Sequence, residues 1–306
     1  MNNTKYYAAA ITAFVIWGFF GFVLKPIDHY PSLDILFYRV FVAGGIMATV
    51  NILIRPRIIR ETRALLLEMP RPQRIKTIVQ VLGGGVLLMA NWFFFIYVMN
   101  HVSIKAASFA YILCPILTTL LASFLLKEKL SLTQWFAVGL SVLSCAILST
   151  HKFTDLLYSL IVALSYALYL VTQPKNNRLD KFLTLAVQIA FSALLLLPFY
   201  PEYRGAIPTE TSFYVFIFII AVVYTIIPLL LNLYALKGLK SSVMGILLYI
   251  NPLINFIVAI GYYKEPIDGL QTIAYLIILF SVVIFNLDIL KKRNRSLNAL
   301  KERSSL

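Results

Sequence analysis

Residues 112–134 read ILCPILTTLLASFLLKEKLSLTQ, and residues 249–271 read YINPLINFIVAIGYYKEPIDGLQ. The two stretches align without a gap when the chain is slid along itself. The register superposes a proline, a charged pair and a glutamine: Pro115 on Pro252, Lys127–Glu128 on Lys264–Glu265, and Gln134 on Gln271. Chance rarely matches all three in one register, so the sequence predicts an internal repeat of two similar halves.

The composition is typical of a membrane protein. Of 306 residues, 60% are hydrophobic and 13% charged, with a mean hydropathy of +0.83, whereas soluble domains have roughly 45–50% apolar and about 25% charged residues. The net charge of +14 does not indicate nucleic acid, because the basic residues fall between apolar runs without a zinc-finger or helix-turn-helix pattern. Cys114 and Cys145 lie inside apolar runs and are expected to be buried thiols, with neither a disulfide nor a metal.

Apolar runs long enough to cross a bilayer, about 20 residues each, follow one another along the chain. We predict ten membrane-spanning helices, at residues 6–24, 34–54, 76–99, 103–126, 132–150, 155–173, 182–200, 212–236, 241–263 and 269–290. No A-x-A-like cleavage site follows the first run, so it is expected to be a retained span and not a signal peptide.

The placement of lysine and arginine predicts the orientation of the chain. With both ends in the cytoplasm, 21 of the 27 basic residues fall in cytoplasmic segments and five in outside segments, leaving Arg39 inside a span. The positive-inside rule favours this topology. The localisation expected from it is multi-pass in a membrane, with both termini in the cytoplasm.

The repeat and the spans together predict the domain organisation. Residues 1–150 form the first half and 151–290 the second, with five spans each, and 291–306 form a basic cytoplasmic tail. Because five is odd, the second half enters the membrane in the opposite direction. Between spans two and three, residues 57–69 have apolar side chains at helical spacing with arginines opposite, which predicts an amphipathic helix on the cytoplasmic leaflet.

Inverted repeats with a proline in equivalent spans are the pattern of secondary transporters. Each proline removes a backbone donor and frees a carbonyl one turn earlier. Pro115 and Pro252 are therefore either tolerated kinks or hinges that also form part of a site wall.

Several stretches resemble one transporter family. They are FVIWGFFG (14–21), DILFYRV (34–40), ANWFFFIYVMN (90–100), AASFAYILCP with LLKEK (106–115 and 125–129), and the run from VYTIIPLLL to YINP with YYKEP (223–252 and 262–266). Over nearly the whole chain the sequence is similar to the RarD-type branch of the EamA transporters, in the drug/metabolite transporter superfamily. The resemblance implies ten helices, two EamA repeats around a central cavity, and movement of small metabolites across a bacterial inner membrane.

Arg39 is a charged residue inside a predicted apolar span, and its position needs an explanation. It lies about 8 Å into span two, at ~1.5 Å per residue, where a lipid-facing charge is costly. One interpretation is that its side chain snorkels outward. The other is that it faces a polar cavity and holds an anionic group through a bidentate contact, a position at which the family motif also has an arginine.

Other candidate substrate-binding residues are polar or aromatic side chains within spans. Asn91 needs a hydrogen-bond partner, which is either another helix or substrate and cavity water. Asn251 and Asn255 lie four apart and share a helix face, as do their repeat counterparts Cys114 and Thr118. The aromatic candidates, each weighed against plain packing, are Trp92, Trp17, Tyr111 and Tyr249. Gln188 and Asn232 are weaker candidates of the same kind, and Gly83–Gly85 predict close helix approach or bending.

The repeated Lys–Glu pairs, Lys127–Glu128 and Lys264–Glu265, lie at span ends. They are expected to be interfacial ion pairs that mark the boundary or act as gate latches. No H-E-x-x-H, G-x-S-x-G or Walker motif and no paired mid-span aspartate is present, so no catalytic residue, metal or cofactor is expected.

The function predicted from the sequence is alternating-access transport of a small metabolite or drug-like molecule, by an exporter, facilitator or exchanger. No carboxylate lies clearly in mid-span, which favours facilitated diffusion or exchange over proton coupling. The alternatives are a flippase for lipids or amphiphiles, or a membrane-embedded enzyme. The expected partners are a small-molecule substrate and the lipid bilayer; a homodimer is left open beside a monomer, and nucleic acid is not expected.

Overall fold

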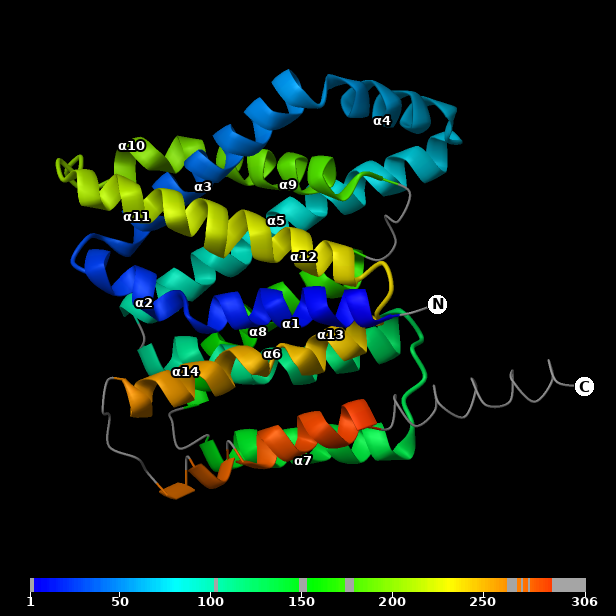
Figure 1. The fold of residues 1–306 in the computed structure, drawn as a ribbon, viewed down its shortest axis with the longest axis vertical. Helices are drawn as coiled ribbons and strands as arrows, with labels where there is room; N and C mark the ends of the chain where they lie inside the picture. The colour runs from blue at the N-terminus through cyan, green and yellow to red at the C-terminus, as the bar shows by residue number, and fades with distance from the viewer. Residues whose placement is uncertain are drawn as a thin grey trace, which may run out of the picture.

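A computed structural model describes residues 3–101, 104–148, 153–173, 179–262, 269–270, 272–274 and 276–287. Over these ranges the chain is nearly all helical (Figure 1). The helices of the first half are α1 (Thr4–Gly18), α2 (Phe20–Leu24), α3 (Ser32–Thr49), α4 (Pro56–Glu68), α5 (Arg71–His101), α6 (Ile104–Leu125) and α7 (Leu132–Leu148). Those of the second half are α8 (Phe153–Thr172), α9 (Lys181–Leu196), α10 (Tyr200–Tyr203), α11 (Thr211–Ala221), α12 (Ile227–Ala235), α13 (Ser241–Leu247), α14 (Ile250–Gly261) and an apolar helix at Thr272–Leu287.

The apolar helices follow the predicted spans closely. Four are long and apolar enough to cross a membrane, at Ser32–Ile54, Arg71–Phe95, Lys181–Tyr203 and Thr211–Ala235. The first span is a pair, Thr4–Gly18 and Phe20–Ile27, bent by 41°. The remaining predicted spans correspond to shorter apolar helices, so the count of ten stays a prediction. The fold class itself, an all-helical membrane protein, is confirmed.

Large apolar side chains cover the outside of the bundle. Leu132 is 88% exposed, Leu53 and Ile54 are each 73% exposed, and Phe124 is 70% exposed. Continuous apolar surface of this kind is unfavourable in water and suits contact with lipid.

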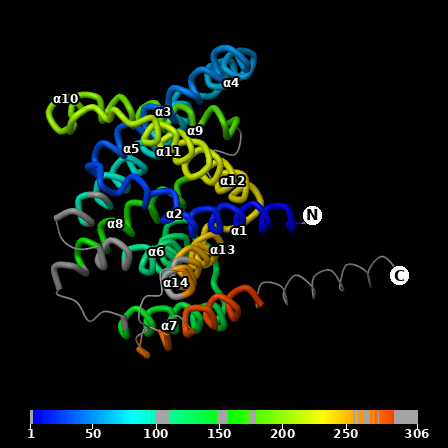
Figure 2. The backbone as a smooth tube through the Cα atoms, turned by 60° about the vertical axis from the view of Figure 1, so that its left-hand side comes forward, coloured from blue at the N-terminus to red at the C-terminus, as the bar shows by residue number. Residues whose placement is uncertain are grey.

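The two ends of the bundle collect different segments (Figures 1 and 2). The start of α1, helix α4 and the link between α12 and α13 gather at one end, and α2 and α10 at the other. These are the segments for which the basic residues predict the cytoplasmic and the outside face, respectively. Helix α4 begins at Pro56, a first helical position where the missing N–H of proline costs nothing; its place on the cytoplasmic leaflet stays a prediction.

Helix contacts follow the internal repeat. In the first half, α5 and α6 pack against α8 of the second half. The repeat counterparts of these two helices, α12 and α14, pack against α1, the counterpart of α8. Figure 1 shows α1 between α12 and α13–α14. At the centre, α3 contacts α9 and α6 contacts α13. Each half therefore completes the core of the other, as a pseudo-two-fold arrangement requires.

The crossing of α6 and α13 leaves no room for a side chain at Gly245. A Cβ atom there would lie 2.8 Å from the Cβ of Thr118 and 3.1 Å from the carbonyl oxygen of Pro115. The backbone of the second half thus rests directly on the proline turn of the first. Small residues permit such close approach between membrane helices.

The triple glycine of α5 serves the same purpose against α9. A Cβ on Gly84 or Gly85 would overlap Gln188, whereas one on Gly83 would meet no atom within 4 Å. The Ser192 hydroxyl donates to the Gly85 carbonyl at 2.9 Å. Of the two expectations for these glycines, the structure shows close helix approach.

Helices α3 and α9 are tied together at both ends by aspartates. Asp34, at the start of α3, is buried and accepts hydrogen bonds from the Gly205 N–H, 3.0 and 3.2 Å from its two oxygens. Asp180, just before α9, forms two 3.1 Å hydrogen bonds with the Arg55 guanidinium and caps α9 at the Leu183 N–H. Each aspartate lies at the start of one helix and contacts the segment after the other, so the two helices are expected to move as a unit.

We expect Gly245→Ala to lower the free energy of unfolding by about 1–3 kcal/mol, the usual cost of overpacking. Gly83→Ala is the matched control, because its methyl group meets only open space and alanine favours a helix by up to about 1 kcal/mol over glycine. Thermal unfolding of both variants in detergent measures the difference. Equal stability of the two would contradict the tight crossing.

A second prediction concerns acid. Burial alone would raise the pKa of the Asp180 carboxyl group, but the hydrogen bonds from Arg55 and Leu183 and the charges of Arg55 and Lys237 lower it below its ordinary 3.8. A lowered pKa contributes stability that is complete above the unfolded value and is lost as the pH falls through the folded value.

Melting temperatures from pH 7 to pH 3 should therefore fall more steeply for the natural protein than for Asp180→Asn. Asp28→Asn removes only an exposed pair with Lys25 and should keep the natural slope. Identical slopes for all three proteins would show that the Arg55–Asp180 pair is not energetically coupled to folding.

Candidate functional site

The guanidinium group of Arg39 lies over the ring of Trp92, 4.7 Å from its centroid. Arg39 comes from α3 and Trp92 from α5. The Arg39 side chain is half-buried, and its Nε atom is fully buried without a hydrogen-bond partner. A cation on an aromatic face gains about 2 kcal/mol or more when desolvated, far less than a buried charge loses when it leaves water. Trp92 therefore positions the guanidinium but does not neutralise it.

Asp34, the acidic residue nearest to Arg39 in the sequence, does not pair with it. Its carboxylate is engaged by the Gly205 N–H at the outer end of the bundle. Within the described part of the chain, Arg39 forms no ion pair and no hydrogen bond. Arg39 therefore lies against Trp92, and the choice between its two interpretations stays a prediction.

Tyr111 of α6 completes this side of the site. It lies within electrostatic range of both Arg39 and Cys114, and its ring packs 5.3 Å from that of Phe95. Three helices of the first half, α3, α5 and α6, thus bring together Arg39, Trp92 and Tyr111, which the sequence analysis named as separate candidates.

Tyr166 of α8 is a member of the cluster that the sequence analysis missed. Its hydroxyl is buried without a partner, and it lies near Tyr111 and Cys114. The Trp17 ring meets it edge-on at 6.0 Å, and the Trp17 Nε1–H donates to the Tyr224 carbonyl at 2.8 Å. The available signal was a tyrosine in mid-span following Ser165. We call Arg39, Trp92, Tyr111, Tyr166 and Trp17 the central cluster.

Tyr249 lies close by but faces a different neighbour. Its hydroxyl is buried without a hydrogen bond and is near Cys114 and Cys145. The adjacent Ser141 hydroxyl is engaged with Ser281, at 2.6 Å. Tyr249 thus adds another unpaired polar atom between α13 and the first half.

Some of the candidate amide side chains are hydrogen-bonded to neighbouring helices, and one is unpaired. Asn91 donates to the Val162 carbonyl at 3.0 Å and the Ser165 hydroxyl at 3.3 Å, which ties α5 to α8. Gln188 donates to Gln173 at 3.1 Å. Both therefore serve helix contacts in this structure. Asn232 is buried with both amide atoms unpaired.

The polar stripes predicted on spans four and nine are only partly described. The Thr118 hydroxyl donates to the Cys114 carbonyl one turn earlier, at 2.8 Å, and faces Gly245. Asn251 is buried on α14, and the Asn255 side chain lies outside the described residues. The stripes stay a prediction.

Both repeat prolines lie near the crossing of the two halves. Pro115 is inside α6, and Pro252 follows the break between α13 and α14. The Leu248 carbonyl, which Pro252 deprives of its usual donor, accepts instead from the Asn251 N–H at 3.1 Å. The predicted ninth span is therefore broken next to Pro252, and a tighter turn satisfies its backbone hydrogen bonds.

Glu128 differs from the expected interfacial ion pair. Its carboxylate accepts hydrogen bonds from the Ser241 N–H at 3.0 Å and the Ser242 N–H at 3.1 Å, and from the Ser242 hydroxyl. It thus caps α13, where a negative charge is favourable. Lys127 has a positive φ of 55°, which turns the chain after α6 and directs Glu128 to α13. Lys264 and Glu265 lie outside the described residues.

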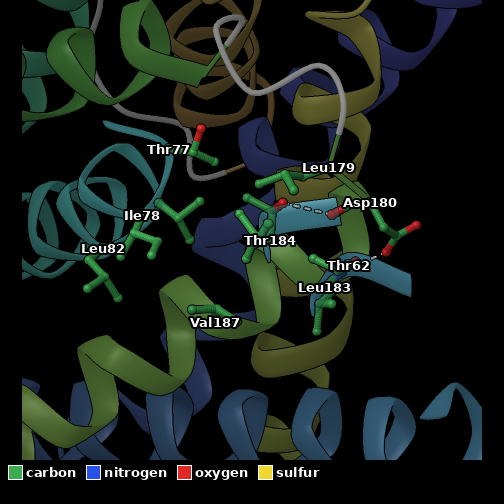
Figure 3. Close-up of a pocket in the computed structure, with 11 residues that line it drawn as sticks. Thr62, Thr77, Ile78, Leu82, Leu179, Asp180, Leu183, Thr184 and Val187 are labelled. Atoms are coloured by element: carbon green, nitrogen blue, oxygen red, sulfur yellow. Dashed lines mark hydrogen bonds between the residues drawn. The ribbon is translucent and has the colours of Figure 1, made fainter. Parts of the chain in front are cut away.

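The cavity in Figure 3 is separate from the central cluster. It has a volume of about 130 Å³ and is lined by Thr62 and Leu66 of α4, Thr77, Ile78, Val81 and Leu82 of α5, and Leu179, Asp180, Leu183, Thr184 and Val187. The lining is mostly apolar, and its one charged side chain, Asp180, is held by Arg55. We therefore do not assign the substrate to it. Among the described residues, no group of three metal-ligating side chains occurs.

We expect Glu128→Gln to lower the free energy of unfolding by roughly 1.5–3 kcal/mol, because it weakens hydrogen bonds to a charged group. Glu61→Gln is the control, since Glu61 pairs with Arg57 on the exposed face of α4 and should matter little. Chemical unfolding in mild detergent compares them. A Glu128 effect no larger than that of Glu61 would contradict its capping role.

Comparison with known proteins identifies the family to which this architecture belongs. The EamA-like transporter family matches twice, over residues 4–150 and 154–287. The chain is 27% identical to "Uncharacterized transporter YojE" of Bacillus subtilis, covering 93% of this chain and 94% of that one. It is 26% identical to "Protein RarD" of Escherichia coli, covering 94% and 95%. One solved structure, titled only "Crystal structure of protein", superposes with a TM-score of 0.71 at 16% identity, covering 93% and 97%, and so shares the fold. The chain is therefore a multi-pass membrane protein that belongs to the EamA-like transporter family.

Proposed function

We propose that this transporter moves a small metabolite across the bacterial inner membrane by alternating access, with the substrate bound at the central cluster. The observation that carries the proposal is the set of buried polar atoms without partners where the two halves meet. They include Nε of Arg39 and the hydroxyl of Tyr166. Buried polar groups are nearly always paired, so a place where several are not is a place where a ligand supplies the missing contacts.

The origin of the cluster supports the mechanism. Arg39, Trp92, Tyr111 and Trp17 come from the first half, and Tyr166 comes from the second. Rocking one half against the other changes which end of the bundle opens while the substrate stays between them. Pro115 inside α6 and the break before Pro252 supply the hinges in this scheme.

The contacts at the bundle ends support the same scheme. Asp34 and Asp180 hold α3 and α9 together at both ends, which suits a unit that moves without deforming. Glu128 joins α6 to α13 at the end predicted to be cytoplasmic. We propose that this contact acts as the inner latch, with Glu265 at the equivalent repeat position on the other side.

The test uses purified protein in liposomes loaded with a bacterial metabolite extract. Mass spectrometry of the external solution should show one or a few small metabolites leaving faster than from protein-free liposomes. A protonophore should leave the rate unchanged, because no carboxylate lies clearly in mid-span to carry proton coupling. Protein-containing liposomes that release nothing above background would contradict the proposal.

The same liposomes test the flippase alternative. With a fluorescent phospholipid in both leaflets, a membrane-impermeant reductant bleaches only the outer leaflet unless lipid crosses. We expect the same bleached fraction with and without the protein. Lipid crossing without metabolite release would favour the flippase.

A further inference from the structure

We infer that the substrate is a small monoanion whose carboxylate pairs with Arg39. This inference rests on the proposed function, because it names the chemical class of the substrate at the central cluster. It starts from the guanidinium of Arg39, which lies over Trp92 on a half-buried side chain. Its Nε atom is fully buried, and the group has no ion pair or hydrogen bond within the described part of the chain.

The first step is the missing counter-charge. A buried cation requires an anion close by, since the cost of desolvation is otherwise uncompensated. Asp34 is committed to Gly205, and Asp180 to Arg55. Glu128 is committed to the start of α13. None of these three described carboxylates is free to neutralise Arg39, and a bound anion would complete the site.

The second step is the number of charges. Arg39 is the one lysine or arginine that falls inside the predicted spans rather than at their ends. One negative charge therefore balances the site, whereas a dianion would bring an uncompensated charge into the core. A carboxylate also matches the planar fork of the guanidinium, which can bind it through two parallel hydrogen bonds. The unpaired Nε is available for the side-on form of this contact.

The third step is the body of the ligand. The side chains beside the guanidinium are aromatic: Trp92 beneath it, Tyr111 within range of its charge, and Tyr166 with Trp17 beyond. Walls of this kind favour an apolar or aromatic body with few polar groups. The unpaired hydroxyl of Tyr166 supplies one further hydrogen bond. A small aromatic monocarboxylate meets all of these requirements.

The experiment is a thermal-shift titration of the purified full-length protein with three probes of similar shape. Benzoate is the monoanion, benzamide the neutral analogue and phthalate the dianion. Benzoate should raise the melting temperature, and the other two should raise it much less. In Arg39→Gln the apparent Kd for benzoate should rise by roughly 30-fold or more, the usual effect of removing one partner of a buried charge pair.

The variants separate binding from folding. Without ligand, Arg39→Gln should melt at the same temperature as the natural protein or higher, because it removes an uncompensated charge. Arg39→Lys keeps the charge but loses the planar fork. Its benzoate affinity should therefore lie between that of the natural protein and that of Arg39→Gln. Arg57→Gln is the matched control, since the Arg57 side chain is 84% exposed on α4, and it should bind benzoate as the natural protein does.

Four results would overturn the inference: equal stabilisation by benzamide, stronger stabilisation by phthalate, unchanged benzoate affinity in Arg39→Gln, or unfolding of ligand-free Arg39→Gln. Failure of this inference differs from failure of the proposed function. If the loaded liposomes release a neutral or cationic metabolite at the same rate with Arg39→Gln, the transporter proposal stands and the anion site falls. If they release nothing while benzoate still binds through Arg39, the anion site stands and the transporter proposal falls.

Discussion

The fold depends on the crossing of α6 and α13, where Gly245 rests against Pro115 and Thr118 with no space for a Cβ atom. This contact joins the two halves at the position where each carries its repeat proline. Around it, the spans of one half pack against those of the other, so neither half has a complete core alone. The interface between the halves is also where the unpaired polar atoms Nε of Arg39 and the hydroxyl of Tyr166 lie.

The same interface collects the polar groups that the bilayer would not tolerate. Some of them form hydrogen bonds within the protein: Asn91 ties α5 to α8, and Gln188 donates to Gln173. Others are left without partners, chiefly Nε of Arg39 and the hydroxyls of Tyr166 and Tyr249. The separation has a physical meaning, because paired groups fix the helices and unpaired groups remain available to a ligand. The ties at the ends of α3 and α9 hold Arg39 at a fixed depth between Trp92 and Tyr111.

The apolar helices, the repeat and the separate candidates Arg39, Trp92 and Tyr111 were predictable from local signals. Hydropathy sets span length, and the match of Pro115 with Pro252 sets the register of the halves. Three features were not predictable, because they depend on how the halves meet. Tyr166 enters the cluster through the packing of α8, and Asp180 pairs with Arg55 from the other half. Glu128 binds α13 instead of an adjacent lysine. Sequence neighbours alone suggested ion pairs there, whereas the helix start opposite Glu128 offers stronger donors.

The central claim is that the cluster around Arg39 faces the two sides of the membrane in turn. The most direct measurement places a cysteine at Tyr111, in a protein whose buried Cys114 and Cys145 are replaced by alanine. Membrane-impermeant thiol reagents are then applied to right-side-out and to inside-out vesicles. The account predicts labelling of Tyr111→Cys from both sides, with no labelling of a control cysteine at Phe93, which is 40% exposed on the outer surface of α5. Labelling from one side only, or from neither, would contradict alternating access at this site.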